Sequence, residues 1–171
     1  NVEVTQDSNR FGNQGFNIRG LEGNRVSIEI DGIPLSDGFS VGQFASAGRD
    51  LVELGVIERV EILRGPASTL YGSKALAGVV AYTTLDPANA DFSDGKLRGG
   101  ASLGTQSRDE SQSWSANLMA NGMDGRFTFL AAAGQISGHE LSNQDETPED
   151  QAHPADSQRD SALLTFGMDF A

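Results

Sequence analysis

The residues that could perform catalysis in this sequence are few, and none has the partner that its chemistry needs. His139-Glu140 begins like the helix of a zinc protease, but Asn143 stands where that motif requires its second histidine. Gly72-Ser73-Lys74 has serine and lysine in the wrong order for a phosphate-binding loop. Cysteine is absent, and no nucleophile is accompanied by a base. We therefore predict that the protein is not an enzyme, with no catalytic residues and no metal site.

The overall composition indicates a folded chain built from strands and turns. Over 171 residues, 37% are hydrophobic and 21% are charged, which argues against disorder throughout the chain. The 21 glycines against 5 prolines favour closely spaced strands over a helical bundle. A formal net charge of −12 argues against a nucleic-acid partner, because phosphate binding needs a clustered excess of Lys and Arg. No apolar stretch approaches the ~20 residues of a membrane-spanning helix, whereas membrane β-strands need only ~10 residues of alternating character.

Short strands and glycine-rich turns are predicted for the first half of the chain. Three segments have the alternation or the β-branched enrichment of strands: 26–30, 57–64 and 78–85. The first of them is expected to have one buried face and to end at the turn pair Asp31-Gly32. Residues 33–49 show no period and are predicted to form a long loop. Residues 65–72, which begin with Gly65-Pro66 and end at Gly72, predict one short helix.

Strict alternation marks the second half. Four segments each present one apolar and one small or polar face: 97–105, 113–121, 126–133 and 161–170. Their connections include a tight turn at 122–125 and a long acidic loop at 138–160, which is typical of an outer-membrane barrel. A soluble antiparallel sheet with one solvated face would show the same alternation. Because single-chain barrels start at roughly 8 strands, four strands cannot close one. Either the chain is a fragment, or its sheet packs on the first half.

Four sequence blocks carry a resemblance to a known family. They are FNIRG at 16–20, RVSIEIDGIP at 25–34, IERVEILRGPASTLYG at 57–72 and GVV at 78–80. In their order and spacing they resemble the plug of TonB-dependent outer-membrane receptors, over about residues 15–87. The resemblance implies an α+β plug domain at residues 1–90. It also implies that residues 96–171 form the first four antiparallel strands of a transmembrane β-barrel, part of a plugged barrel of about 22 strands.

The same resemblance implies a location and a set of partners. The location is the bacterial outer membrane, so membrane lipid is one partner, and no nucleic acid is expected. Ligand uptake would be energised by the TonB complex through an N-terminal segment missing from this chain. RGLEGNRV at 19–26, LAGVV at 76–80 and TLDP at 84–87 look most like the haem, haemoglobin and haemophore receptors. Haem, or haem from a carrier protein, is then the transported ligand and not a permanently bound cofactor.

Other receptors on the same scaffold remain alternatives at this point. A ferric-siderophore or other metal-chelate receptor would differ only in its cargo. A non-transporting surface receptor or adhesin could use the same plug.

Two arginines are implied to anchor the plug. In the family that these motifs resemble, Arg19 of the Ile-Arg-Gly motif and Arg64 of the Leu-Arg-Gly-Pro motif are expected to pair with carboxylates on the barrel wall through charge-assisted bonds. The alternative is a pair inside the plug, for example with Glu58 or Glu61.

One plug loop is expected to face the ligand, and an external loop holds two further candidate residues. By family analogy, the plug loop 33–48 contributes Asp37, Phe39, Ser40, Gln43 and Phe44, although its aromatic residues could instead pack against the barrel wall. The only two histidines, His139 and His153, are candidate residues of the long acidic loop, which is expected to be a solvated external loop; cation binding or docking of a carrier protein is the alternative. Haem ligation needs axial donors such as His or Tyr. Tyr71 and Tyr82 are predicted to be core aromatics.

Overall fold

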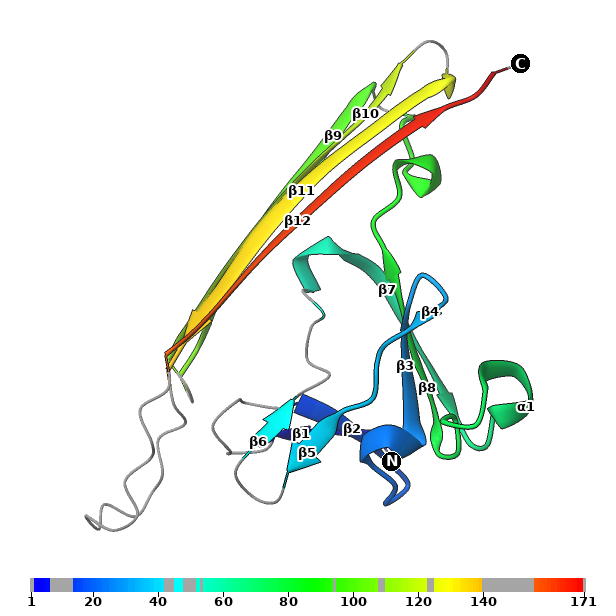
Figure 1. Ribbon diagram of the computed structural model, residues 1–171. Coiled ribbons are helices and arrows are strands. Elements are labelled where there is room, and N and C mark those ends of the chain that lie inside the picture. Colours follow the sequence, from blue (N-terminus) through cyan, green and yellow to red (C-terminus); the bar gives the residue numbers. More distant parts are fainter. Residues whose placement is uncertain are drawn as a thin grey trace. The chain divides into compact units, whose positions relative to one another are not determined.

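The computed structural model describes residues 2–6, 14–41, 45–47, 52, 54–93, 95–107, 110–122, 125–139 and 156–170. Within the chain, two compact units are present (Figure 1). Unit 1 comprises Asn1–Val52 and Arg59–Thr84, and unit 2 comprises Glu53–Glu58 and Leu85–Ala171. In the part of the chain described, no helix is long and apolar enough to cross a membrane.

The centre of unit 1 is a small mixed sheet. Its strands are β3 (Val26–Ile30), β4 (Ile33–Pro34), β7 (Ile57–Arg64) and β8 (Gly78–Thr84), in the order β4-β3-β8-β7. β3 and β8 run parallel, with Val26 opposite Gly78 and Ile30 opposite Tyr82. The three strands predicted in this half are therefore confirmed.

Shorter elements surround this sheet. β1 (Val2–Gln6) pairs antiparallel with β2 (Gln14–Ile18), and β5 (Phe39–Val41) pairs antiparallel with β6 (Ala45–Ala47). The 3-10 turn η1 covers Gly23–Arg25, and α1 covers Ser68–Tyr71. The prediction of one long loop at 33–49 was wrong, because β4, β5 and β6 lie inside it; strands of two or three residues are too short to show a period.

The short helix was predicted correctly in kind but not in extent. α1 begins at Ser68 and not next to Pro66, and it is followed by Gly72 in a positive-φ conformation of 83°. A residue without a Cβ adopts this conformation at little cost, which is why glycine ends the helix.

The core of unit 1 covers both faces of β3. Val26 and Ile28 are buried, as the alternation predicted, but Ser27 and Glu29 on the opposite face are buried as well. The expectation of a single buried face was wrong, because β3 is a central strand flanked by β4 and β8 and covered on both sides. Tyr82 is a core residue as predicted, whereas Tyr71 is 40% exposed and is not.

The predicted turn at Asp31-Gly32 joins β3 to β4. Both residues have positive φ angles, 50° and 77°, as a two-residue hairpin turn requires. The Asp31 carboxylate accepts hydrogen bonds from the Thr84 backbone N–H at 2.9 Å and from the Thr84 hydroxyl at 2.7 Å. The turn is thereby tied to the end of β8.

Unit 2 is built on four long antiparallel strands (Figure 1). They are β9 (Leu97–Gln106), β10 (Ser111–Gly122), β11 (Phe127–Gly138) and β12 (Ser157–Met168), and each pairs with the next along the chain. All four alternating segments of the second half are confirmed as strands. Two 3-10 turns, η2 (Leu54–Val56) and η3 (Pro87–Asn89), belong to the same unit.

The apolar face of this sheet is the exposed one. Leu103, Leu164 and Phe166 are 88%, 73% and 64% exposed. On the small and polar face, Leu130 is fully buried, and Met119 and Ala132 are buried with it. A soluble sheet buries its apolar face and exposes its polar one. In unit 2, by contrast, the apolar face is the exposed one.

Two segments that precede the four strands in sequence cover the buried side of the sheet. Val56 next to η2 and three residues after β8 pack against the buried cluster of Met119, Leu130 and Ala132; these three are Leu85, Ala90 and Phe92. The Leu85 backbone N–H donates to the Val56 carbonyl at 2.9 Å, which joins the two segments. We call these segments, residues 54–56 and 85–92, the sheet brace.

Candidate functional site

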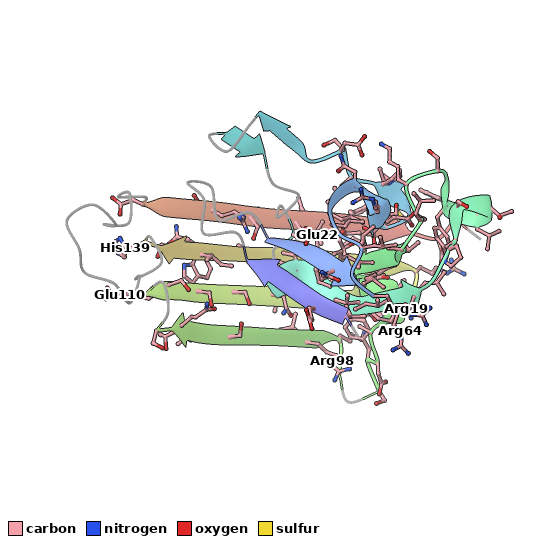
Figure 2. The ribbon with its side chains drawn as sticks, turned by 90° about the horizontal axis from the view of Figure 1, so that it is seen from below. Arg19, Glu22, Arg64, Arg98, Glu110 and His139 are labelled. Atoms are coloured by element: carbon pink, nitrogen blue, oxygen red, sulfur yellow. The ribbon has the colours of Figure 1, made fainter. Side chains whose placement is uncertain are left out.

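Arg19 and Arg64 follow two residues that meet at Gly78. A Cβ built on Gly78 would lie 2.2 Å from the Leu63 carbonyl oxygen and 3.0 Å from Ile18 Cδ1, so the two motifs that contain these residues both lie against Gly78. Both arginine side chains are exposed, and they are labelled close together in Figure 2. The described part of the chain gives neither guanidinium a hydrogen bond or an ion pair.

The backbone of Arg19 is held in an uncommon conformation. Its φ is 55°, in the left-handed region that costs a non-glycine residue about 1 kcal/mol. Two backbone hydrogen bonds between Ile18 and Leu21, of 2.9 and 3.1 Å, close the turn around it. Asn17 Oδ1 also accepts from the Gly20 N–H at 2.8 Å. These hydrogen bonds fix the backbone conformation from which the Arg19 side chain extends.

The described residues show no ion pair of Arg64 with Glu58 or Glu61. Glu61 instead lies 3.7 Å from Arg59, its neighbour on the same face of β7. Glu58 shares a face with Arg64 but is six residues away, which is roughly 20 Å along a strand.

The start of the predicted ligand-facing loop is attached to the rest of unit 1. Asp37 Oδ1 is 3.0 Å from Lys74 Nζ. The Asn24 side chain accepts from the Gly38 N–H at 2.8 Å and donates to the Gly38 carbonyl at 3.0 Å. Phe39 and Ser40 belong to β5, while Gln43 and Phe44 lie outside the described residues. The sequence did not predict that Asn24 and Lys74 contact this loop, because their partners are 14 and 37 positions away.

His139 lies at the end of β11, where the long acidic loop begins. Its Nδ1 is 2.7 Å from Oδ1 of Asp156, the residue that precedes β12. His139 and Glu110 lie at one end of the sheet and Arg98 at the other (Figure 2). The second histidine of the prediction, His153, is outside the described residues.

The connection between the sheet brace and β9 carries its own polar contacts. The Asp91 carboxylate accepts from the Ser93 backbone N–H at 2.9 Å and from the Ser93 hydroxyl at 3.2 Å. These hydrogen bonds, with a smaller contribution from the charge of Arg98, hold the pKa of Asp91 below its ordinary value. Arg98 Nη1 donates to the Asp91 carbonyl. These contacts join Asp91 to Ser93 and to Arg98 of β9.

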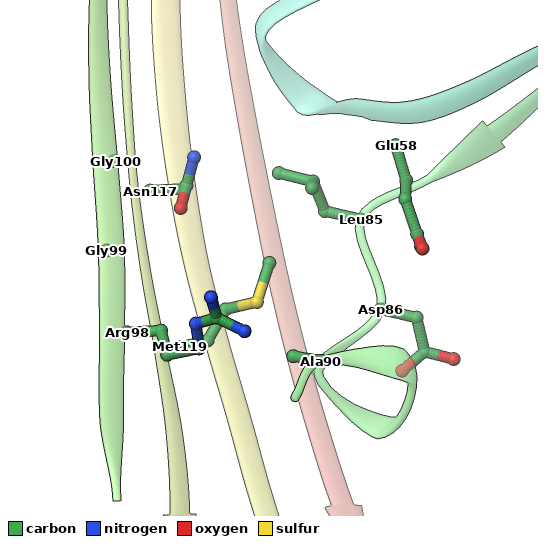
Figure 3. Close-up of a pocket in the computed structure, with 9 residues that line it drawn as sticks. All are labelled: Glu58, Leu85, Asp86, Ala90, Arg98, Gly99, Gly100, Asn117 and Met119. Atoms are coloured by element: carbon green, nitrogen blue, oxygen red, sulfur yellow. The ribbon is translucent and has the colours of Figure 1, made fainter. Parts of the chain in front are cut away.

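A shallow pocket lies beside this connection in unit 2 (Figure 3). The pocket is lined by the apolar residues Leu85, Ala90 and Met119, by Gly99 and Gly100 of β9, and by the polar residues Glu58, Asp86, Arg98 and Asn117. The lining residues of β9 belong to an edge strand of the sheet.

Comparisons with known proteins agree with this architecture. Residues 1–79 match the family model of the TonB-dependent receptor plug domain. The chain is 31% identical to haemoglobin and haemoglobin-haptoglobin-binding protein A of Haemophilus influenzae, over 95% of this chain and 16% of that protein. It is 32% identical to the vitamin B12 transporter BtuB of Vibrio vulnificus, over 58% of this chain and 16% of that protein. The chain thus spans about a sixth of these relatives.

A solved structure shares the fold over nearly the whole chain. The FrpB iron transporter of Neisseria meningitidis superposes with a TM-score of 0.74 and 18% identity, covering 99% of this chain and 25% of the transporter. The similarity therefore includes the long antiparallel strands as well as the plug.

Proposed function

Because the chain belongs to the TonB-dependent receptors of the bacterial outer membrane, we propose that it is part of a receptor that takes up an iron-containing ligand, namely haem or haem from a carrier protein. Uptake would be energised by the TonB complex acting on a segment N-terminal to this chain. The ligand is cargo in this proposal and not a resident cofactor.

One structural observation carries the proposal: the sheet of unit 2 exposes its apolar face, while Met119, Leu130 and Ala132 on the opposite face are buried. The strands of a membrane barrel are arranged in the same way, with an apolar band that faces lipid and a polar interior. Residues of the sheet brace cover the interior side, as expected where a plug occupies a barrel lumen. We propose that residues 1–90 are the plug and residues 96–171 the first four strands of a barrel of about 22 strands.

The choice of haem as cargo rests on the relatives. Three proteins of Haemophilus influenzae whose names state haemoglobin or haemoglobin-haptoglobin binding are 31–32% identical over 80–95% of this chain. The match to the vitamin B12 transporter covers 58%. A siderophore or other metal-chelate receptor, or a non-transporting surface receptor, is the alternative outcome of the test below.

Residue roles follow from this proposal. Arg19 and Arg64 anchor the plug through carboxylates of barrel strands beyond this chain, which agrees with their exposure and with the lack of a partner among the described residues. The ligand-facing surface includes the β5–β6 region with Phe39, Ser40, Gln43 and Phe44. His139 and His153 contribute through the external loop.

The test is a parallel titration of the full-length receptor in detergent with haemin, haemoglobin and a ferric siderophore. We expect binding of haemin or haemoglobin and none of the siderophore. Binding of the siderophore alone would replace the cargo by a metal chelate. Binding of none of the three by folded receptor would contradict the proposal as a whole.

A further inference from the structure

The start of the ligand-facing loop has an unusual density of attachments. Within residues 35–38, which we call the loop base, three residues are bonded to three different segments of the chain. The Leu35 N–H donates to the Ile28 carbonyl of β3 at 2.8 Å. Asp37 pairs with Lys74, and Gly38 pairs with Asn24. A loop that only needed to connect β4 to β5 would not require side chains from two other segments.

The Asn24 contact uses both halves of a side-chain amide. Oδ1 accepts from the Gly38 N–H, and Nδ2 donates to the Gly38 carbonyl, so the amide reproduces the pairing of a β-bridge. Only Asn and Gln carry a donor and an acceptor in this geometry. Asn24 itself lies in η1, immediately before β3, so Gly38 is bound to the start of a central strand.

The backbone next to Lys74 is held in place as well. The next residue, Ala75, is fully buried and donates its N–H to the Gly72 carbonyl at 3.1 Å. The charged groups themselves are about half exposed, 47% for Lys74 and 46% for Asp37. A pair this exposed adds little stability. Its effect is to restrict where the loop base lies.

Asp37 is thereby occupied before any ligand arrives. Its carboxylate already has a cation at 3.0 Å, and the backbone of the next residue is held on both sides by Asn24. β5 begins directly after this point, with Phe39 opposite Ala47 and Val41 opposite Ala45. The hairpin formed by β5 and β6 therefore begins directly after a residue that Asn24 holds.

We propose that Asn24 and Lys74 are positioning residues of the ligand-facing surface. They hold the loop base so that the β5–β6 hairpin is presented in one orientation, and Asp37 acts through Lys74 instead of contacting the ligand. We call the contacts of Asn24 with Gly38 and of Lys74 with Asp37 the clamp. The inference rests on the proposed function for the identity of the ligand, but not for the existence of the clamp.

The clamp is tested without ligand by hydrogen–deuterium exchange on the full-length receptor. In Asn24→Ala, we expect exchange in residues 38–41 to rise by roughly 5-fold, as loss of two neutral hydrogen bonds predicts. Exchange in β3 and β8 should stay unchanged. Asn89→Ala is the matched control, because Asn89 is exposed and no side-chain hydrogen bond is described for it. Unchanged exchange in residues 38–41 of Asn24→Ala would overturn the proposal.

The role of Asp37 is tested by a charge exchange, with haemin and haemoglobin as probes. We expect Asp37→Lys and Lys74→Asp each to weaken binding by roughly 3- to 10-fold, and the double variant to return to within about 2-fold of the wild type. Lys96→Asp is the control, since Lys96 is exposed and has no described ion pair. If Asp37 contacts the ligand, the double variant stays as weak as Asp37→Lys, which overturns this part.

The two arms separate the clamp from the proposed function. If the wild-type receptor binds neither probe, the proposed cargo is wrong, and the exchange experiment still decides whether Asn24 holds the loop base. In that case, the Asp37→Lys and Lys74→Asp variants are compared by hydrogen–deuterium exchange at residues 38–41. The double variant should restore the wild-type exchange rate. A double variant that exchanges as fast as the single ones would overturn the pairing role.

Discussion

Gly78 lies against Leu63 so closely that a Cβ at position 78 would be 2.2 Å from the Leu63 carbonyl oxygen. The same Cβ would lie 3.0 Å from Ile18 Cδ1. Three motifs that are far apart in sequence, at 16–20, 57–72 and 78–80, thus meet at one glycine. The close approach also brings Arg19 and Arg64, the residues that follow Ile18 and Leu63, to the same region of unit 1.

Replacement of Gly78 by alanine should destabilise unit 1 severely. The clash is with a backbone carbonyl, which cannot move without displacing β7, so we expect a loss above about 3 kcal/mol. Protease resistance of residues 1–84 in the full-length receptor measures the effect. Gly122→Ala is the control, because its added Cβ would meet Phe127 Cδ1 at an ordinary 3.5 Å. Equal resistance of the two variants would contradict this reading of Gly78.

Neighbouring leucines of β12 should have different effects on the sheet brace. Leu163 packs against the cluster of Met119, Leu130 and Ala132, whereas Leu164 points to the exposed face. In Leu163→Ala, the cavity should speed amide exchange at Leu85, whose N–H bonds to Val56, by roughly 5-fold or more. In Leu164→Ala, the same amide should exchange at the wild-type rate. A similar change in both variants would show that the two faces are not distinct.

A charge on the exposed apolar face should be costly only within its apolar band. Leu164→Lys places an ammonium group where we propose lipid, with an expected cost of up to about 2–4 kcal/mol near the bilayer midplane. Gln158→Lys, on the same strand and near its polar end, should cost at most about 1 kcal/mol. Urea unfolding of the full-length receptor in phospholipid vesicles provides the comparison. If the two variants were equally stable, the face would not be in lipid.

Asp91 should titrate below an ordinary aspartate. Its hydrogen bonds from Ser93 favour the charged form and lower its pKa. The stabilising contribution is therefore complete above the ordinary aspartate pKa and is lost as the pH falls through the lower folded value. Carbon-13 NMR of labelled aspartate, assigned with Asp91→Asn, measures the titration. Ser93→Ala should raise the pKa, while Ser73→Ala should leave it unchanged; an unmoved pKa in Ser93→Ala would contradict the assigned cause.

Removal of Arg64 should loosen the plug without unfolding the barrel. The guanidinium is exposed and unpaired in the described part of the chain, so its partner is proposed to lie on the barrel wall. We expect Arg64→Ala to increase amide exchange across β7 and β8 of the full-length receptor by several-fold, which corresponds to roughly 1–2 kcal/mol. Arg59→Ala is the control, since Arg59 pairs with Glu61 on the surface. No difference between the variants would remove the anchoring role.

The sequence predicted the strands better than the contacts between them. Residues 26–30, 57–64 and the four later segments alternate or carry β-branched residues. All of them form strands in the structure. The alternation could not say which face of the second sheet is buried. That depends on Leu85 and Phe92, apolar residues outside any strand whose role becomes visible only when they pack on Leu130.

The candidate site shows the same limit. Asp37 was identified from its position in a loop, but Lys74 and Asn24, which fix that loop, lie in other segments. Side-chain partners separated by 14 or 37 residues leave no period in the sequence. Arg19 and Arg64 were identified from motif resemblance, and no rule of local structure would have brought them together.

The most direct measurement of the central claim is iron accumulation in bacterial cells whose only outer-membrane route for the metal is the full-length receptor. Radiolabelled haemin and a radiolabelled ferric siderophore are supplied separately, with the TonB complex present or deleted. We predict that label from haemin enters the cells and that entry stops when TonB is deleted. Correctly inserted receptor that accumulates neither label, or accumulates label equally without TonB, would contradict the account.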